Sequence, residues 1–157
     1  MPTLEIFDKR NDFLSFDLRD LLEVIEPFAS RLDWYVVEFE PAVLSAAAEH
    51  GRGSPPSWVT ELWHKSEAGA VEAISWERLK ELSTHITQTM NALFVGTDAG
   101  APAPTLTLDP NDEHYKLVIQ AVDTSFWAVT SHDENVLQAL KGRFNDVKLR
   151  PATQRYF

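Results

Sequence analysis

Cysteine is missing from this 157-residue sequence. Its absence excludes disulfide bonds and thiolate metal sites. Long apolar runs are missing as well: none approaches the roughly 18 residues that a membrane-spanning helix needs, and the amino end lacks the apolar core of a signal peptide. These absences predict a cytoplasmic protein with no membrane partner.

Motifs that carry catalysis or bind cofactors are also missing. The five histidines form no HExxH pair or other short metal-binding spacing, and there is no G-x-S-x-G elbow, P-loop or dinucleotide fingerprint. Asp109, Asn111 and Glu113 alternate like the start of a calcium loop, but His114 stands where that loop needs glycine, so we interpret them as turn residues. The sequence therefore predicts no metal and no cofactor and favours a protein that is not an enzyme. Catalytic residues distant in sequence stay an open alternative, because triads assemble in space.

The chain does contain enough apolar material for a core. Hydrophobic residues make up 44% of the sequence and aromatic residues 11%, and a chain of this length normally forms one domain around a single core. We therefore expect residues 1–157 to form one α+β domain. Its sheet is predicted to be mixed or antiparallel, built from hairpins and packed against several short helices.

Acidic residues outnumber basic ones, and they are unevenly distributed. The formal net charge is −10; residues 1–50 hold eleven acids and four bases, whereas residues 141–157 hold five bases and one acid. A general nucleic-acid-binding function is disfavoured because phosphate contacts need a basic surface. An acidic surface attracts a basic protein partner instead, although solubility alone also explains the charge.

The clearest secondary-structure pattern is a hairpin in the carboxy-terminal half. Lys116–Val122 and Phe126–Thr130 are rich in residues that favour strands, and the turn-forming residues 123–125 separate them. Apolar residues on both faces of the first arm indicate a strand that is covered on both sides. This hairpin is the element around which we expect the rest of the sheet to form.

An amphipathic helix and a short strand are predicted after the hairpin. Ser131 and Glu134 have the spacing of a capping box, in which each side chain bonds the backbone N–H of the other. The helix is predicted from about His132 to Phe144, with its apolar residues on one face. Val147–Leu149 is predicted to return as a strand.

The other elements are predicted from apolar periodicity, capping residues and proline positions. They are a strand Leu4–Phe7, a helix from Asp17 kinked or restarted at Pro27, a strand Trp34–Glu40 with Tyr35, Val37 and Phe39 on one face, a helix from Pro41 to Gly51, short helices capped by Ser57 and Ser75, and a hairpin of Ile86–Met90 and Leu93–Thr97 turning at Asn91-Ala92. Asp98–Pro110 contains several prolines and no periodicity, and is predicted to be a long loop.

The first helix carries most of the candidate binding residues. Asp17 and three acids that follow it at intervals of three residues form a ridge beside the apolar stripe. Asp17 is explained as the helix N-cap, and Asp20 as a charge that complements the positive end of the helix dipole. The next two acids have no such local explanation. A solvated helix face is the simpler interpretation, and a docking surface is the sharper one. The predicted partner-binding residues are Asp17, Asp20, Glu23, Glu26, Glu38 and Glu40.

Two segments resemble a known class of protein. The first is Ile86–Gln88 with Asn91–Gly96, and the second is Ile119–Trp127, followed by Asp133 and Phe144. They resemble small cytoplasmic bacterial proteins, including immunity proteins that protect cells from polymorphic toxins. The resemblance covers the carboxy-terminal half, and its motifs are structural. It implies a stoichiometric inhibitor of a toxin, and the acidic amino-terminal third then predicts a basic target such as a nuclease.

The alternative is a small-molecule-binding or enzymatic α+β domain with a pocket between the sheet and the loop 98–110. Gln88, Gln120 and Trp127 line this pocket if the two predicted hairpins pair side by side. In the competing interpretation Gln120 satisfies a neighbouring backbone group and Trp127 belongs to the core. A self-associating structural protein is supported only by the aromatic content, and the oligomeric state stays open.

Overall fold

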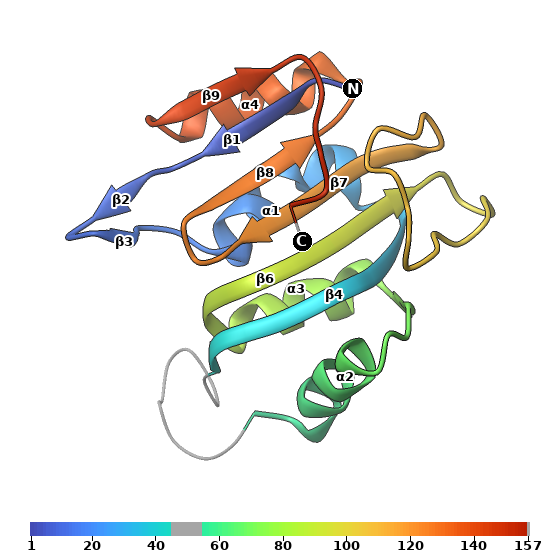
Figure 1. Cartoon of the computed structure of the whole chain (residues 1–157). Helices are drawn as coiled ribbons and strands as arrows, with labels where there is room; N and C mark the ends of the chain where they lie inside the picture. Colours follow the sequence, from blue (N-terminus) through green and yellow to red (C-terminus); the bar gives the residue numbers. More distant parts are fainter. Residues whose placement is uncertain (45–54, 157) are drawn as a thin grey trace.

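The computed structural model describes residues 1–44 and 55–156. In these residues a seven-stranded sheet and a set of helices form an α+β fold, which confirms the predicted class (Figure 1). The sheet has the order β5-β4-β6-β7-β8-β1-β9, and every neighbouring pair is antiparallel. Strands β2 and β3 form a separate hairpin. The elements are β1 (Thr3–Ile6), β2 (Lys9–Arg10), β3 (Phe13–Leu14), α1 (Leu18–Ala29), β4 (Asp33–Leu44), α2 (Ser57–Glu67), β5 (Glu72–Ile74), α3 (Trp76–Thr84), β6 (Ile86–Thr97), β7 (Tyr115–Val122), β8 (Phe126–Thr130), α4 (Glu134–Arg143) and β9 (Val147–Arg150).

The carboxy-terminal half folds as predicted in outline. β7 and β8 form the expected hairpin, with Val122 opposite Phe126 next to the turn. The turn residues Asp123 and Thr124 both have positive φ, the geometry that matches the twist of the two strands. α4 follows, and β9 returns to pair with β1 rather than with the hairpin.

The start of α4 corrects the predicted capping box. Asp133 is the N-cap, and its carboxylate accepts a hydrogen bond from the Asn135 N–H at 2.9 Å. Ser131 instead donates from its Oγ to the Lys116 carbonyl at 3.1 Å and accepts from the Asp133 N–H at 3.0 Å. Ser131 therefore joins the end of β8 to β7, and the helix begins at Glu134.

β6 corrects the hairpin that was predicted at Asn91-Ala92. The segment is one continuous strand because both neighbours pair through the predicted turn: Asn91 lies opposite Glu40 of β4, and Ala92 lies opposite Ala121 of β7. Asn-Ala also lacks the glycine that a tight turn favours. The Asn91 side chain serves a different turn, since its Oδ1 accepts the Asp123 N–H at 2.9 Å.

β4 corrects the helix predicted to begin at Pro41. The strand continues to Leu44, and the pairing with β6 is irregular on both sides of Pro41. Proline is tolerated here because such irregularities free the position from donating to the ladder. The rest of that predicted helix, residues 45–51, lies outside the described residues.

A bulge in β4 corrects the predicted facing of its side chains. The register with β6 shifts between Val36 and Glu38. An extra residue inverts the alternation of a strand, so Phe39 packs in the same cluster as Trp34 and Val36, while Val37 packs in a cluster on the other face. Glu38 is thereby turned away from the helices.

The remaining helices begin close to the predicted positions. α1 follows the N-cap Asp17, α2 begins at Ser57, and α3 follows Ser75, whose Oγ accepts a first-turn N–H at 3.1 Å. α1 neither ends nor restarts at Pro27 but runs to Ala29. Pro27 lies in the last turn of α1, where its missing N–H removes one backbone hydrogen bond from the helix. Within the described residues no helix has the length and apolar character to cross a membrane.

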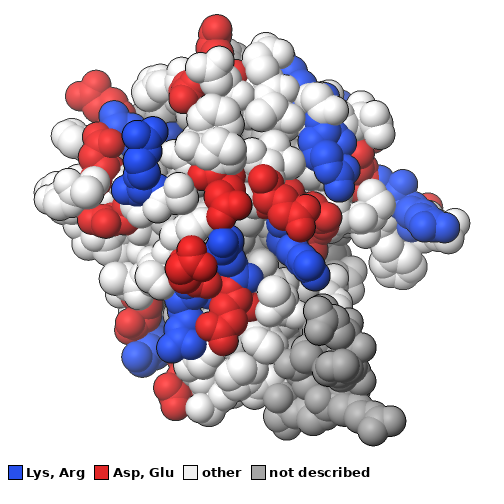
Figure 2. All heavy atoms as spheres, turned by 180° about the vertical axis from the view of Figure 1, so that it is seen from behind, with Lys and Arg blue, Asp and Glu red and all other residues white. Residues whose placement is uncertain are grey.

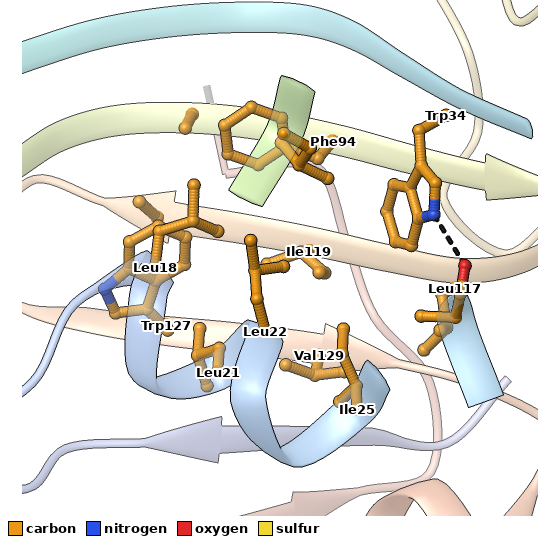
Figure 3. Close-up of a cluster of buried hydrophobic side chains, with 14 of the residues drawn as sticks. Leu18, Leu21, Leu22, Ile25, Trp34, Phe94, Leu117, Ile119, Trp127 and Val129 are labelled. Carbon is orange, nitrogen blue, oxygen red and sulfur yellow. Dashed lines mark hydrogen bonds between the residues drawn. The ribbon is translucent and has the colours of Figure 1, made fainter. Parts of the chain in front are cut away.

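The main core lies between the helices and one face of the sheet. Figure 3 shows the inward side chains of α1 against those of the central strands, with Trp34 at one end of the cluster. The Trp34 Nε1–H donates to the Ala29 carbonyl at 2.9 Å, which links β4 to the end of α1. Each fully buried aliphatic side chain stabilises the fold by about 1.5–3 kcal/mol. The buried side of α1 therefore fixes the position of its acidic outer side. The α1 side chains in the core are Leu18, Leu21, Leu22, Ile25 and Ala29.

The opposite face of the sheet is covered by irregular chain. A smaller apolar cluster there includes Leu108, from the long loop, and Val118 of β7. The predicted loop at 98–110 is confirmed and extends to residue 114. The segment after β9, residues 151–156, crosses in front of this face (Figure 1); we call it the tail. The two faces thus differ: one is covered by helices and the other by the loop and the tail.

Candidate partner-binding groove

A groove follows α1 on the helix side of the molecule. Three adjoining hollows of about 210, 280 and 210 Å³ form it. The first and second share Phe16 and Asp17 among their lining residues, and the second and third share Arg19 and Thr84, so the three hollows are neighbours along the surface. The first hollow lies beside the β2–β3 hairpin, and the third lies between α1 and α3. We call this depression the α1 groove.

The α1 groove gathers the whole predicted ridge of acids. Asp17 lines the first and second hollows, Asp20 the second, and Glu23 and Glu26 the third. The cations among the lining residues are Arg19 and Lys80. Carboxylates therefore outnumber cations along the groove, and the i, i+3 spacing on α1 correctly predicted their common side.

Asp17 is a carboxyl group whose ionisation is strongly altered by its surroundings. It occupies the N-cap of α1, is half-buried, and its Oδ2 accepts a hydrogen bond from Thr89 Oγ1 at 3.2 Å. Burial raises the pKa of Asp17 to about 7, against the opposing effect of the Thr89 hydrogen bond, and the nearby Asp20 raises it further. Its charge is therefore set by small changes in pH around neutrality or by a nearby cation.

Asp20 and Glu23 have weak local partners. Asp20 accepts the Asp17 N–H at 3.0 Å and lies 3.8 Å from the Arg143 guanidinium. Glu23 lies 3.8 Å from Arg19, and both side chains are more than half exposed. Exposed ion pairs contribute only about 0–1 kcal/mol. A partner that brings its own cations can therefore replace them with little loss.

Glu26 is held more firmly, because its partners come from the neighbouring helix α3. Its Oε1 accepts hydrogen bonds from Lys80 Nζ at 2.9 Å and Trp76 Nε1 at 3.2 Å. The hydrogen bond from Lys80, followed by that from Trp76, lowers the pKa of Glu26. Lys80 also lies 3.6 Å from Glu77 of α3. Glu77 was not predicted as a site residue. Its position on the outer face of the helix predicted after Ser75 could have indicated it.

Glu38 and Glu40 do not line the α1 groove. Glu38 Oε1 accepts a hydrogen bond from the Arg155 guanidinium of the tail at 3.1 Å, on the other side of the sheet. Glu40 is exposed and accepts from Asn91 Nδ2 at 3.1 Å. The six predicted carboxylates therefore do not form one surface. Four of them line the α1 groove, and the bulge in β4 turns Glu38 away from the helices.

The three predicted pocket residues lie in three different environments. Gln88 lines the first hollow of the α1 groove. Gln120 is fully buried under the tail, where it donates to the Gln154 carbonyl at 3.1 Å and accepts the Tyr156 N–H at 3.4 Å. Trp127 is fully buried in the core on the helix side. These contacts support the interpretation in which Gln120 satisfies neighbouring backbone groups and Trp127 belongs to the core.

A separate hollow of about 410 Å³ lies where the long loop leaves the sheet; we call it the loop pocket. Apolar side chains and charged side chains both line it, and Lys116 Nζ lies 3.5 Å from the Asp98 carboxylate at its rim. Only Asp98 in its lining belongs to the long loop, and the apolar lining residues belong to the core on the helix side of the sheet. It is therefore a different hollow from the pocket predicted between the sheet and the loop 98–110. The lining residues are Phe28, Leu32, Asp98, Lys116, Leu117, Ser131, His132, Asp133 and Val136.

The chemistry of the α1 groove is that of hydrogen-bond acceptors and negative charge. Figure 2 shows the helix side, where acidic side chains near the middle have basic side chains beside them, in agreement with the ion pairs above. Among residues 1–44 and 55–156 no group of three or more acidic or histidine side chains is arranged to hold a metal ion. Comparisons of the chain with protein-family models, with curated proteins and with solved structures found no match.

Proposed function

We propose that this chain is a binding protein, an immunity-type inhibitor that receives the basic face of a toxin in the α1 groove. The observation that carries the proposal is the placement of four carboxylates, Asp17, Asp20, Glu23 and Glu26, in three adjoining hollows along α1. A toxin nuclease suits such a groove, because it holds phosphate with lysine and arginine side chains. Covering those side chains excludes its substrate and requires no chemistry from the inhibitor.

Electrostatic steering gives the groove a kinetic role as well. A charged surface raises the association rate of an oppositely charged partner by roughly 10–1,000-fold, and salt weakens the effect. The exposed pair of Arg19 with Glu23 exchanges readily for pairs with the partner, whereas Asp20 also accepts the Asp17 N–H. The inhibitor therefore binds fast and at a salt-dependent rate.

The test uses a basic toxin nuclease as the partner, sought first among the products of genes that neighbour the gene for this chain. Co-expression of the chain should restore growth, and stopped-flow mixing should show association that slows as salt increases. The double variant Asp20→Lys/Glu23→Lys should slow association by at least tenfold at low salt while its circular dichroism stays unchanged. Growth inhibition that persists with the wild-type chain contradicts the proposal.

A matched control separates the groove from net charge. Glu61 on α2 and Glu113 in the long loop are exposed and lie outside the groove lining. The variant Glu61→Lys/Glu113→Lys changes the net charge equally and should leave association within about twofold of the wild type. Equal slowing in both double variants shows that overall charge, and not the groove, attracts the partner.

The loop pocket supports a second candidate function, the binding of a small molecule. Its volume of about 410 Å³ lies within the roughly 300–1,000 Å³ of typical ligand sites, and apolar walls with a few charged groups are typical of such sites. A thermal-shift screen against metabolites tests it. A true ligand should raise the melting temperature of the wild type and do so less in Lys116→Ala.

A further inference from the structure

We infer that the first hollow of the α1 groove is an anchor site for one lysine or arginine side chain of the partner. In this site Asp17 is the counter-ion, and Phe13 and Val43 are apolar walls. The inference rests on the proposed function and names the chemistry that the groove recognises.

The apolar walls are the first observation behind the anchor site. Large hydrophobic side chains that are exposed are few in the described part of the chain: Phe13, Val43, Leu106 and Leu149. Phe13 is 66% exposed and Val43 47%, and both line the first hollow. Exposed apolar side chains that line a depression offer a partner side chain an apolar contact. Here they come from two segments distant in the sequence.

The β2–β3 hairpin holds Phe13 in place. Arg10 lies opposite Phe13, and the two turn residues between them, Asn11 and Asp12, both have positive φ. This is the tight two-residue turn that fits the twist of a hairpin. Figure 1 shows the hairpin reaching away from the sheet beside the start of α1. Phe13 is therefore presented by a defined element next to the hollow.

The shape of the hollow matches a side chain with an apolar stem and a charged end. Lysine and arginine pack their methylene groups on apolar surface while the charge reaches a polar group. Phe13 and Val43 offer such surface, and the Asp17 carboxyl group lines the same hollow. Thr87 and Gln88 add oxygen acceptors at its rim. A neutral apolar side chain would leave Asp17 without a charged partner.

The groups that face Asp17 favour a cation at this position. From α1 these are Asp20, which is negative, and Arg19, which pairs with Glu23 at 3.8 Å. From β6, Thr89 donates a hydrogen bond, and the side chains that α3 contributes, Ser83 and Thr84, are uncharged. On the β2–β3 hairpin, Lys9 and Arg10 lie opposite Leu14 and Phe13 but do not line the hollow. The charged side chains that line the first two hollows are Asp17, Asp20 and Arg19, so a positive end group meets net negative charge when Asp17 is ionised.

Binding at this site is linked to proton release. The pKa of Asp17 is about 7 in the free protein because the carboxyl group is partly buried. A cation beside it stabilises the charged form and lowers this pKa. Binding near neutral pH therefore releases a proton, and affinity rises with pH between about 6 and 8, up to about tenfold if only the ionised form binds.

The experiment uses the acetylated, amidated tripeptide Lys-Lys-Lys as the probe, with the same peptide acetylated on its side-chain amines as the control. Titration into isotope-labelled protein should shift the backbone NMR signals of Asp17, Thr87 and Thr89 with the probe and not with the control. Affinity should rise from pH 6 to pH 8. Asp17→Asn should lower affinity at pH 8 about tenfold and abolish the pH dependence.

Asn keeps a good N-cap, so Asp17→Asn is expected to fold. Asp109→Asn removes the same charge from the long loop and should bind like the wild type. Shifts confined to the third hollow, with Asp17→Asn binding like the wild type, overturn the anchor site and leave the proposed function standing. Shifts at the anchor site combined with no protection from the toxin overturn the proposed function and leave the anchor site standing.

Discussion

Carboxylates on the two sides of the sheet have different partners. On the helix side Glu23 pairs with the exposed Arg19 of the same helix. On the other side Glu5 is only 6% exposed; it lies 2.8 Å from Arg150 and accepts a hydrogen bond from the Tyr156 hydroxyl at 2.8 Å. The same residue type is available for binding on one side and part of the structure on the other.

The difference follows from what crosses each surface. The tail runs over the sheet face that contains Glu5, Gln120 and Glu38, and it supplies a partner to each of them. Burial, followed by the hydrogen bond to Glu5, raises the pKa of Tyr156 to about 12. Each of these side chains therefore has its own partner in the tail, and removing one side chain deprives its tail partner of that hydrogen bond. The exposed pair of Glu23 with Arg19 carries no such coupling.

The largest expected effect is in the core that positions α1. Leu21→Ala removes a fully buried side chain from the interface between α1 and the sheet and should lower the free energy of unfolding by about 3 kcal/mol, within the 2–5 kcal/mol usual for such changes. Urea denaturation measures it. A loss below about 1 kcal/mol would mean that α1, and the groove with it, is not fixed by its buried side.

Breaking the tail side should have the next largest effect. Glu5→Ala leaves the Tyr156 hydroxyl and the Arg150 guanidinium without their carboxylate and should lower the free energy of unfolding by about 2 kcal/mol. Glu5→Gln retains an acceptor and should lower it by less. Equal losses in the two variants would show that packing, rather than hydrogen bonding, gives Glu5 its role. The measurement is again urea denaturation.

Asp17 should make stability depend on pH in an unusual direction. Its pKa is raised from 3.8 to about 7 in the folded protein, so the folded state binds the proton more tightly than the unfolded state. Its contribution to stability therefore falls as pH rises from about 4 to about 7 and stays low above that. Asp17→Asn should be more stable than the wild type by about 1–2 kcal/mol at pH 8 and equal to it at pH 4. Unfolding curves at the two pH values measure this, and an equal difference at both would contradict the raised pKa.

The smallest expected effect is on the outer side of α1. Glu23→Gln breaks the exposed pair with Arg19 and should change the free energy of unfolding by less than about 0.5 kcal/mol. Thermal unfolding at low and high salt measures it. A larger loss would show that Glu23, like Glu5, is needed for the structure and is not freely available to a partner.

Local patterns predicted the elements that depend on neighbours in sequence. The β7–β8 hairpin, the cap of α3 at Ser75 and the ridge on α1 all follow from residues within a few positions of one another. The prediction at Asn91 was wrong because its strand is decided by two long-range neighbours, β4 and β7. Ser131 has a capping sequence, but the Lys116 carbonyl of a neighbouring strand takes its hydroxyl.

The sequence by itself determined the α+β class, the identity of the long loop and the alignment of the α1 carboxylates, because periodicity and spacing act along the chain. Only the tertiary structure decided which carboxylates remain accessible. Arg155 meets Glu38 across 117 positions of sequence, and Tyr156 meets Glu5 across 151. Such pairings depend on where the tail crosses the sheet, and that path is set by packing of the whole chain rather than by any local pattern.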